Sequence, residues 1–194
     1  SRWITKDKIK LPLYFPMVVD EITLKSAWRS AGNELIKRVE QGERVVFIAQ
    51  GDISLFSTGS YLSMELEKNH PECSIKLIPG VTSFSAAAAT SKCPLALQDE
   101  QVLVVPVPEE SSQLKAILLE AAATKRVVVL LKLGKKWFWV RQLLEELELL
   151  ESSIFAERAG LLDEKIVKAS QLTSDSRPYF SLLVIRQSWP SVMP

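Results

Sequence analysis

The stretch RVVFIAQGDISLFSTGS, residues 44–60, joins an apolar run to a loop of Gly, Asp and small hydroxyl residues. The run, Arg44–Ala49, is continuous and rich in β-branched residues, which is typical of a strand buried on both faces of a parallel sheet. The loop after it has two interpretations. Gly, Asp and Ser are common in turns and helix caps, but α/β proteins also bind ligands at the carboxyl ends of their strands. The residues of this stretch leave both open.

An alternation of helices and strands runs through the first half of the chain. Apolar spacing predicts a helix over Ile22–Glu40, and Ser74–Val81 is a second short strand that ends in Pro-Gly. An alanine-rich helix follows it, with Thr82 or Ser83 placed to cap its start. Helices between strands indicate an α/β fold with crossover connections. The loop Pro79–Ser85 then falls at the same sheet edge as the loop after Ala49.

The second half contains further strands, but they do not alternate regularly with helices. Three or four strands with two helices predict an α+β or mixed-sheet domain. We place the domain boundary after Pro94, which gives domains of residues 1–97 and 98–194. The strands are expected at residues 101–107, Arg126–Leu133, residues 153–160 and Tyr179–Gln187, and the helices at Leu114–Ala123 and residues 137–150.

Composition excludes several classes of function. The chain has 24 Lys and Arg against 23 Asp and Glu, so no basic excess points to nucleic acid or to a membrane surface. No apolar run approaches the ~20 residues of a membrane helix. The 2 Cys predict reduced thiols in a cytoplasmic protein, and 1 His argues against a His-based triad or a metal site. Neither a phosphate-binding P-loop motif nor a G-x-G-x-x-G fingerprint is present.

Four stretches together resemble the tetrapyrrole (corrin/porphyrin) methylases, which use S-adenosylmethionine. They are FIAQGDISLFSTGSYL, IPGVTSFSAAAA, LPLYFPMVVD, and the carboxyl-terminal pair IFAERAGLLDEKI and RPYFSLLVI. The resemblance covers nearly all of the chain. It implies two α/β domains, with a mostly parallel sheet in the first and a mixed sheet in the second. The family's opening Gly-x-Gly-Pro-Gly strand-loop has no counterpart here, so the first domain is expected to be incomplete at its start.

The resemblance is strongest to members that methylate carbon 20 of precorrin-2, or of its cobalt form, in cobalamin biosynthesis. It implies a homodimer, a tetrapyrrole substrate and S-adenosylhomocysteine as a product. It assigns no catalytic side chain, because the sulfonium methyl group is already electrophilic and needs alignment more than acid–base help. The implied S-adenosylmethionine site comprises Gln50, Gly51, Asp52, Leu55, Thr82, Ser83, Leu133 and Ala159. Lys132 and Arg158 are candidates for binding the substrate carboxylates.

Two residues of the first loop depart from the family pattern. Ile53 stands where the family has Pro, which fixes φ in the turn, and Phe56 stands where the family has Tyr. Two alternatives to an active methyltransferase therefore stay open. One is a catalytically impaired relative that still binds the cofactor. The other is an α/β protein-interaction module without a small ligand.

Overall fold

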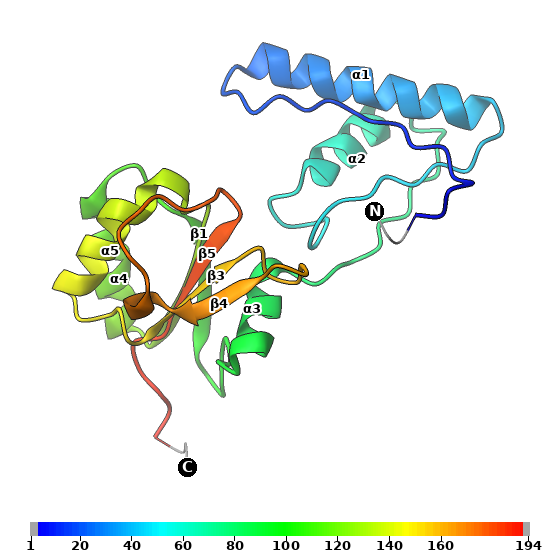
Figure 1. The fold of residues 1–194 in the computed structure, drawn as a ribbon. Helices are drawn as coiled ribbons and strands as arrows, with labels where there is room; N and C mark the ends of the chain where they lie inside the picture. Colours follow the sequence, from blue (N-terminus) through cyan, green and yellow to red (C-terminus); the bar gives the residue numbers. More distant parts are fainter. Residues whose placement is uncertain (1–3, 192–194) are drawn as a thin grey trace. The chain divides into compact units, whose positions relative to one another are not determined.

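The computed structural model describes residues 4–191 (Figure 1). The chain folds as two compact units, Ser1–Gly80 and Val81–Pro194. The domain boundary expected between residues 97 and 98 stays a prediction. Each unit has its own apolar core, and each is described by itself below.

Two helices organise the first unit, α1 (Glu21–Glu40) and α2 (Thr58–Asn69). The carboxylate of Asp20 caps α1 by accepting a hydrogen bond from the backbone N–H of Thr23 at 2.7 Å. The helices pack through buried apolar side chains, which are Ala31, Leu35 and Ile36 from α1 and Leu62 and Leu66 from α2. The helix expected from the apolar spacing over Ile22–Glu40 is confirmed as α1.

The strands expected at Arg44–Ala49 and Ser74–Val81 are not formed. Both segments are extended, but no residue of 44–49 or 74–79 makes a backbone–backbone hydrogen bond within the described part of the chain. Val45 and Phe47 pack on the helices, whereas Val46 and Ile48 are 78% and 66% exposed. The prediction of burial on both faces was therefore wrong. A strand needs a paired neighbour, and none is supplied here, so a parallel sheet in this unit is not confirmed.

The second unit is built on a five-stranded mixed sheet, with strand order β1-β2-β5-β3-β4. The β1–β2 pair is parallel, and the other three pairs are antiparallel. The expected mixed sheet is confirmed. The strands are β1 (Gln101–Pro106), β2 (Arg126–Leu131), β3 (Ser153–Glu157), β4 (Lys165–Lys168) and β5 (Ser181–Ile185).

Helices cover both faces of this sheet (Figure 1). The helix α3 (Ser83–Ser91) lies on one face, and α4 (Ser111–Ala123) and α5 (Trp137–Glu146) lie on the other. Two short 3₁₀ turns are η1 (Gly134–Lys136) and η2 (Ala169–Gln171). Because side chains alternate along a strand, Val127 and Val129 of β2 enter the α3 side of the core, and Val128 and Leu130 enter the other side. The continuous apolar run of β2 is thus explained by burial on both faces.

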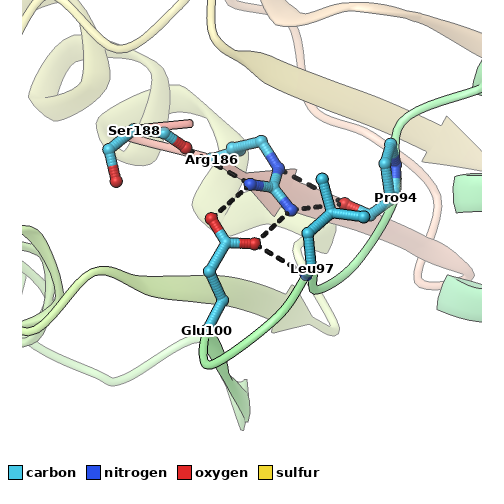
Figure 2. Close-up of polar contacts among 5 residues, drawn as sticks. All are labelled: Pro94, Leu97, Glu100, Arg186 and Ser188. Carbon is cyan, nitrogen blue, oxygen red and sulfur yellow. Dashed lines mark hydrogen bonds and ion pairs between the residues drawn. The ribbon is translucent and has the colours of Figure 1, made fainter. Parts of the chain in front are cut away.

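A buried ion pair joins the connection between α3 and β1 to the end of β5 (Figure 2). The guanidinium of Arg186 donates to both carboxylate oxygens of Glu100, at 2.6 and 2.8 Å, and to the carbonyl of Pro94 at 2.9 Å. Glu100 also accepts from the N–H of Leu97 at 2.8 Å. The two charged side chains are only 1% and 4% exposed. A fork-to-fork pair with these additional hydrogen bonds is the geometry that holds buried charges most strongly.

We predict that Arg186→Leu lowers the free energy of unfolding by about 3–5 kcal/mol, because Glu100 then stays buried without a partner. The double variant Arg186→Leu/Glu100→Leu should recover most of this loss. Lys168→Met, which breaks the exposed Lys168–Glu151 pair, is the matched control and should change stability by less than about 1 kcal/mol. Urea unfolding measures all three. Equal effects of Arg186→Leu and Lys168→Met would contradict the prediction.

The same ion pair predicts a pH dependence. Hydrogen bonding from Arg186 lowers the pKa of Glu100 below its usual value. A carboxyl group with a lowered folded-state pKa stabilises the fold above its unfolded pKa of about 4.3, and this stabilisation is lost as the pH falls through the folded pKa. Unfolding curves from pH 7 to pH 3 should therefore fall more steeply for the native chain than for the double Leu variant. Parallel curves would show that Glu100 is not linked to acid unfolding.

Candidate functional site

The loop Gln50–Ser57 is held together by the carboxylate of Asp52. One oxygen accepts from the backbone N–H of Ser54 at 2.7 Å and from the Ser54 hydroxyl. The other oxygen accepts from the backbone N–H of Gly80 at 2.9 Å. These donors favour the ionised form, so the hydrogen bonds from Ser54 and Gly80 lower the pKa of Asp52. Asp52 thus ties the first loop to the end of the second extended segment.

The two loops meet backbone to backbone. A Cβ atom placed on Gly80 would lie 2.2 Å from the carbonyl oxygen of Gly51, which is closer than any side chain permits. Gly51 itself has φ +73°, in the region that favours glycine. Only glycine at position 80 allows this approach. The expectation that both loops lie together is therefore met, in the first unit, for Gly51, Asp52 and Gly80.

The start of α3 carries the next two predicted residues. The side chain of Thr82 caps the helix, since its Oγ1 accepts from the N–H of Ser85 at 3.2 Å and donates to the Ser85 hydroxyl at 2.8 Å. Ser83 is the first residue of α3 and is exposed. The helix N-terminus offers free N–H groups and a partial positive charge. Of the two candidates, Thr82 and Ser83, Thr82 is therefore the residue that caps α3.

Further predicted residues gather at one edge of the sheet in the second unit. Lys132 and Arg158 follow directly after β2 and β3, and both strands run antiparallel to β5, which lies between them. Lys132 has φ +61° and Arg158 has φ +54°. A long side chain in this left-handed conformation costs about 1–2 kcal/mol. The guanidinium of Arg158 pairs with Asp163 at 2.8 Å.

The loop after β3 lies beside α3. Ala159 is half-buried and packs with the core on the α3 face. A Cβ on Gly160 would lie 3.9 Å from the Cβ of Ala86 in α3. Of the predicted residues, Ala159 is therefore close to the helix that Thr82 caps. All of these contacts lie within the second unit.

Three of the predicted cofactor residues are either fully buried in the core or exposed on the first loop. The side chain of Leu133 is fully buried in the core on the α4 and α5 face, where it packs with Trp137. Leu55 is 37% exposed at the tip of the first loop, and Gln50 is exposed beside it. Their contact with a cofactor stays a prediction. For Leu133 the core packing already accounts for the apolar side chain.

Reasoning from sequence assigned no role to Ser54 or to Gly80. The spacing of Asp52 and Ser54 is the signal for the first, because an Asp side chain commonly accepts from the N–H two residues on. No local signal distinguishes the Gly80 contact from an ordinary Pro-Gly turn, since its partner Gly51 is distant in the sequence.

Across residues 4–191, no cluster of three or more His, Cys, Asp and Glu is arranged to hold a metal ion. Over the same residues, no helix is both long and apolar enough to cross a membrane.

Comparison with solved structures identifies the fold first. The fold is that of the α/β methyltransferase CobJ, with a TM-score of 0.59 and 21% identity over 81% of this chain and 70% of that one. A uroporphyrin-III C-methyl transferase from Thermus thermophilus, solved with S-adenyl homocysteine, has a TM-score of 0.54 and 20% identity over 81% of this chain and 72% of that one. At these identities the likeness concerns the fold alone.

The sequence comparisons identify the family. The family model of the tetrapyrrole (corrin/porphyrin) methylases matches residues 1–173, and the chain belongs to this family. It is 30% identical to the cobalt-precorrin-2 C(20)-methyltransferase of Salmonella typhimurium, over 91% of this chain and 72% of that protein. It is 21% identical to a precorrin-2 C(20)-methyltransferase of Sinorhizobium sp, over 92% and 74% of the two chains. Against the longer CobIJ of Mycobacterium tuberculosis H37Rv the identity is 29%, and the match spans 30% of that protein.

We predict that Gly80→Ala forces the two loops apart, because the added Cβ collides with the Gly51 carbonyl. Overpacking of this kind costs about 1–3 kcal/mol. Amide hydrogen exchange of residues 51–54 should become faster, as measured by mass spectrometry. Gly32→Ala is the control, since its Cβ would lie 3.4 Å from the flexible end of Leu66, and it should leave exchange in this loop unchanged. Unaltered exchange in Gly80→Ala would show that the loops do not depend on this contact.

Proposed function

We propose that this protein is an S-adenosylmethionine-dependent C-methyltransferase that acts on precorrin-2, or on cobalt-precorrin-2, at carbon 20 in cobalamin biosynthesis. The observation that carries the proposal is the 30% identity to a cobalt-precorrin-2 C(20)-methyltransferase over 91% of the chain. Membership of the tetrapyrrole methylase family and a second relative named for precorrin-2 support it.

The residues of the first loop suit a cofactor that is bound mainly by backbone. The missing Cβ of Gly80 leaves the Gly51 carbonyl in close approach, and small residues of this kind let a ligand lie against the main chain. Because Asp52 already binds Ser54 and Gly80, its first role is to hold the loop in shape. We assign S-adenosylmethionine to Gln50, Gly51, Asp52, Leu55, Thr82, Ser83, Leu133 and Ala159.

Methyl transfer requires the protein mainly to align the methyl donor with the substrate carbon. When bound, S-adenosylmethionine would supply a methyl group on a sulfonium; transfer to carbon 20 would form a C–C bond, break the S–C bond, release S-adenosylhomocysteine, and let the hydrogen of carbon 20 leave as a proton. The N-terminus of α3, with the Thr82 cap, can hold an anionic group by its free N–H donors. Lys132 and Arg158 are assigned to the carboxylates of the substrate, since guanidinium and ammonium groups pair well with carboxylates. The chain thereby binds and orients both reactants.

The remaining assignments rest on the family resemblance. We propose two α/β domains and a homodimer in the cytoplasm. Sedimentation velocity of the purified protein tests the oligomer, and a monomer at micromolar concentration would contradict the dimer.

The function is tested by two measurements on the purified protein. Isothermal titration with S-adenosylhomocysteine should give binding, and incubation with S-adenosylmethionine and enzymatically made precorrin-2 should give a product heavier by one methyl group in place of hydrogen. Binding without methylation would indicate an impaired relative, and no binding would indicate an interaction module. Either result overturns the proposal.

A matched pair of variants links the function to the loop. Asp52→Asn replaces one acceptor oxygen by an amide that cannot accept from Ser54 or Gly80, and it should weaken S-adenosylhomocysteine binding by about tenfold, which corresponds to one lost hydrogen bond of ordinary strength. Asp7→Asn changes an exposed acid of the same unit and should leave the affinity unchanged. Equal affinities of the two variants would remove Asp52 from the site.

A further inference from the structure

The segment that leads into β5, residues 177–180, is fixed to its neighbours by backbone hydrogen bonds. The N–H of Arg158, after β3, donates to the carbonyl of Phe180 at 3.0 Å. The N–H of Arg177 donates to the carbonyl of Gly134 at 3.2 Å. Gly134 follows β2 by three residues. The segment is therefore held between the ends of β2 and β3, at the edge where Lys132 and Arg158 lie.

Two aromatic side chains of this segment remain on the surface. Phe180 is 63% exposed and Tyr179 is 45% exposed. Their ring centroids are 5.5 Å apart and the rings are nearly perpendicular, at 76°. Each exposed aromatic ring forgoes about 25 cal/mol per Å² of apolar surface left in water. Adjacent exposed rings on a fixed backbone are the surface that an apolar ligand covers.

Arg177, two residues before Tyr179 in the same segment, adds a positive charge. Its Nη2 donates to the carbonyl and the hydroxyl of Thr173, at 3.2 and 3.0 Å. Its Nε is buried and has no hydrogen-bond partner, and it is the one such side-chain atom in residues 4–191. No carboxylate of those residues lies within ion-pair distance of Arg177. The residue as a whole is half-buried, and its positive charge is not matched by a carboxylate, so it would attract an acidic ligand group.

We propose that Arg177, Tyr179 and Phe180 form a subsite for a ring that is apolar on its faces and carries carboxylates at its edge, namely one pyrrole ring of the tetrapyrrole substrate. This inference rests on the proposed function. The aromatic rings contact the face of the pyrrole, and the Arg177 guanidinium binds an acidic substituent. Arg158 and Lys132, on the flanking strand ends, bring further cations to the same edge. The charge and the apolar surface together match this ligand.

The test measures two affinities of the purified full chain. Precorrin-2, made enzymatically without oxygen, is titrated by absorbance in the presence of S-adenosylhomocysteine, and S-adenosylhomocysteine itself is titrated by calorimetry. Phe180→Ser and Arg177→Gln should each weaken precorrin-2 binding by about tenfold or more, with S-adenosylhomocysteine affinity within twofold of the native chain. Arg177→Lys should fall between, because an ammonium keeps the charge but loses the planar fork. Phe138→Ser, at a 53% exposed Phe of α5, is the matched control and should change neither affinity.

Each other outcome overturns the subsite. If the native chain binds precorrin-2 and the variants bind it equally well, the subsite is wrong and the proposed function stands. If the native chain binds no precorrin-2, the proposed function falls and the subsite with it. If Phe180→Ser instead dissociates a dimer with tetrapyrrole affinity unchanged, the exposed rings are a subunit contact. Hydrogen exchange of residues 174–181 supplies a measurement without variants, since precorrin-2 should slow exchange there and no slowing would contradict the proposal.

Discussion

The hydrogen bond from the Gly80 N–H to the Asp52 carboxylate is the constraint on which the candidate site depends. It joins two loops 28 residues apart, and it coincides with an approach between Gly51 and Gly80 that no side chain would allow. One carboxylate oxygen serves this contact and the other serves Ser54. The acid is thus used to shape the main chain, and the surface offered to a ligand by these loops is largely backbone. A site of this kind distinguishes ligands by shape and by the positions of N–H and C=O groups.

In the second unit, chain segments that are distant in the sequence are held by one charged pair in an apolar setting. Arg186 directly follows β5, the central strand of the sheet, and Glu100 directly precedes β1, an edge strand. The carbonyls of Pro94 and Ser188 take the other donors of the guanidinium. Burying two charges stabilises a fold little compared with apolar packing. The pair contributes mainly by determining which turn may lie beside the β5 terminus, since any other neighbour would leave the Arg186 charge unmatched.

Sequence reasoning succeeded where local signals and burial agree. The apolar spacing over Ile22–Glu40 predicted α1, and the apolar run Arg126–Leu133 predicted the strand β2, which is covered on both faces. The same kind of run at Arg44–Ala49 failed, because pairing is a property of neighbouring strands and is not encoded in the run itself. For the site, the resemblance pointed to Gly51 and Asp52, but the role of Gly80 depends on a three-dimensional approach. Leu133 shows a second limit of the sequence. An apolar residue at a strand end has the same sequence pattern whether it packs in the core or contacts a ligand, and Leu133 packs in the core.

Two residues at the edge of the sheet in the second unit have a strained backbone conformation. After β2 and β3 the chain turns through left-handed residues, where Gly or Asn adopts φ > 0 at little cost. The sequence instead has Lys132 and Arg158 at these positions, and each costs about 1–2 kcal/mol relative to glycine in that conformation. Neither enters the buried core, so packing does not offset this cost. Positive φ is not confined to this edge, since Lys92, Lys125 and Glu148 also adopt it, and the Arg158 guanidinium pairs with Asp163. At this edge the two cations lie on the strand ends beside the segment that carries Tyr179 and Phe180. The backbone conformation alone therefore does not separate a binding edge from a structural turn, and the role proposed for these cations rests on their chemistry and their place at the strand ends.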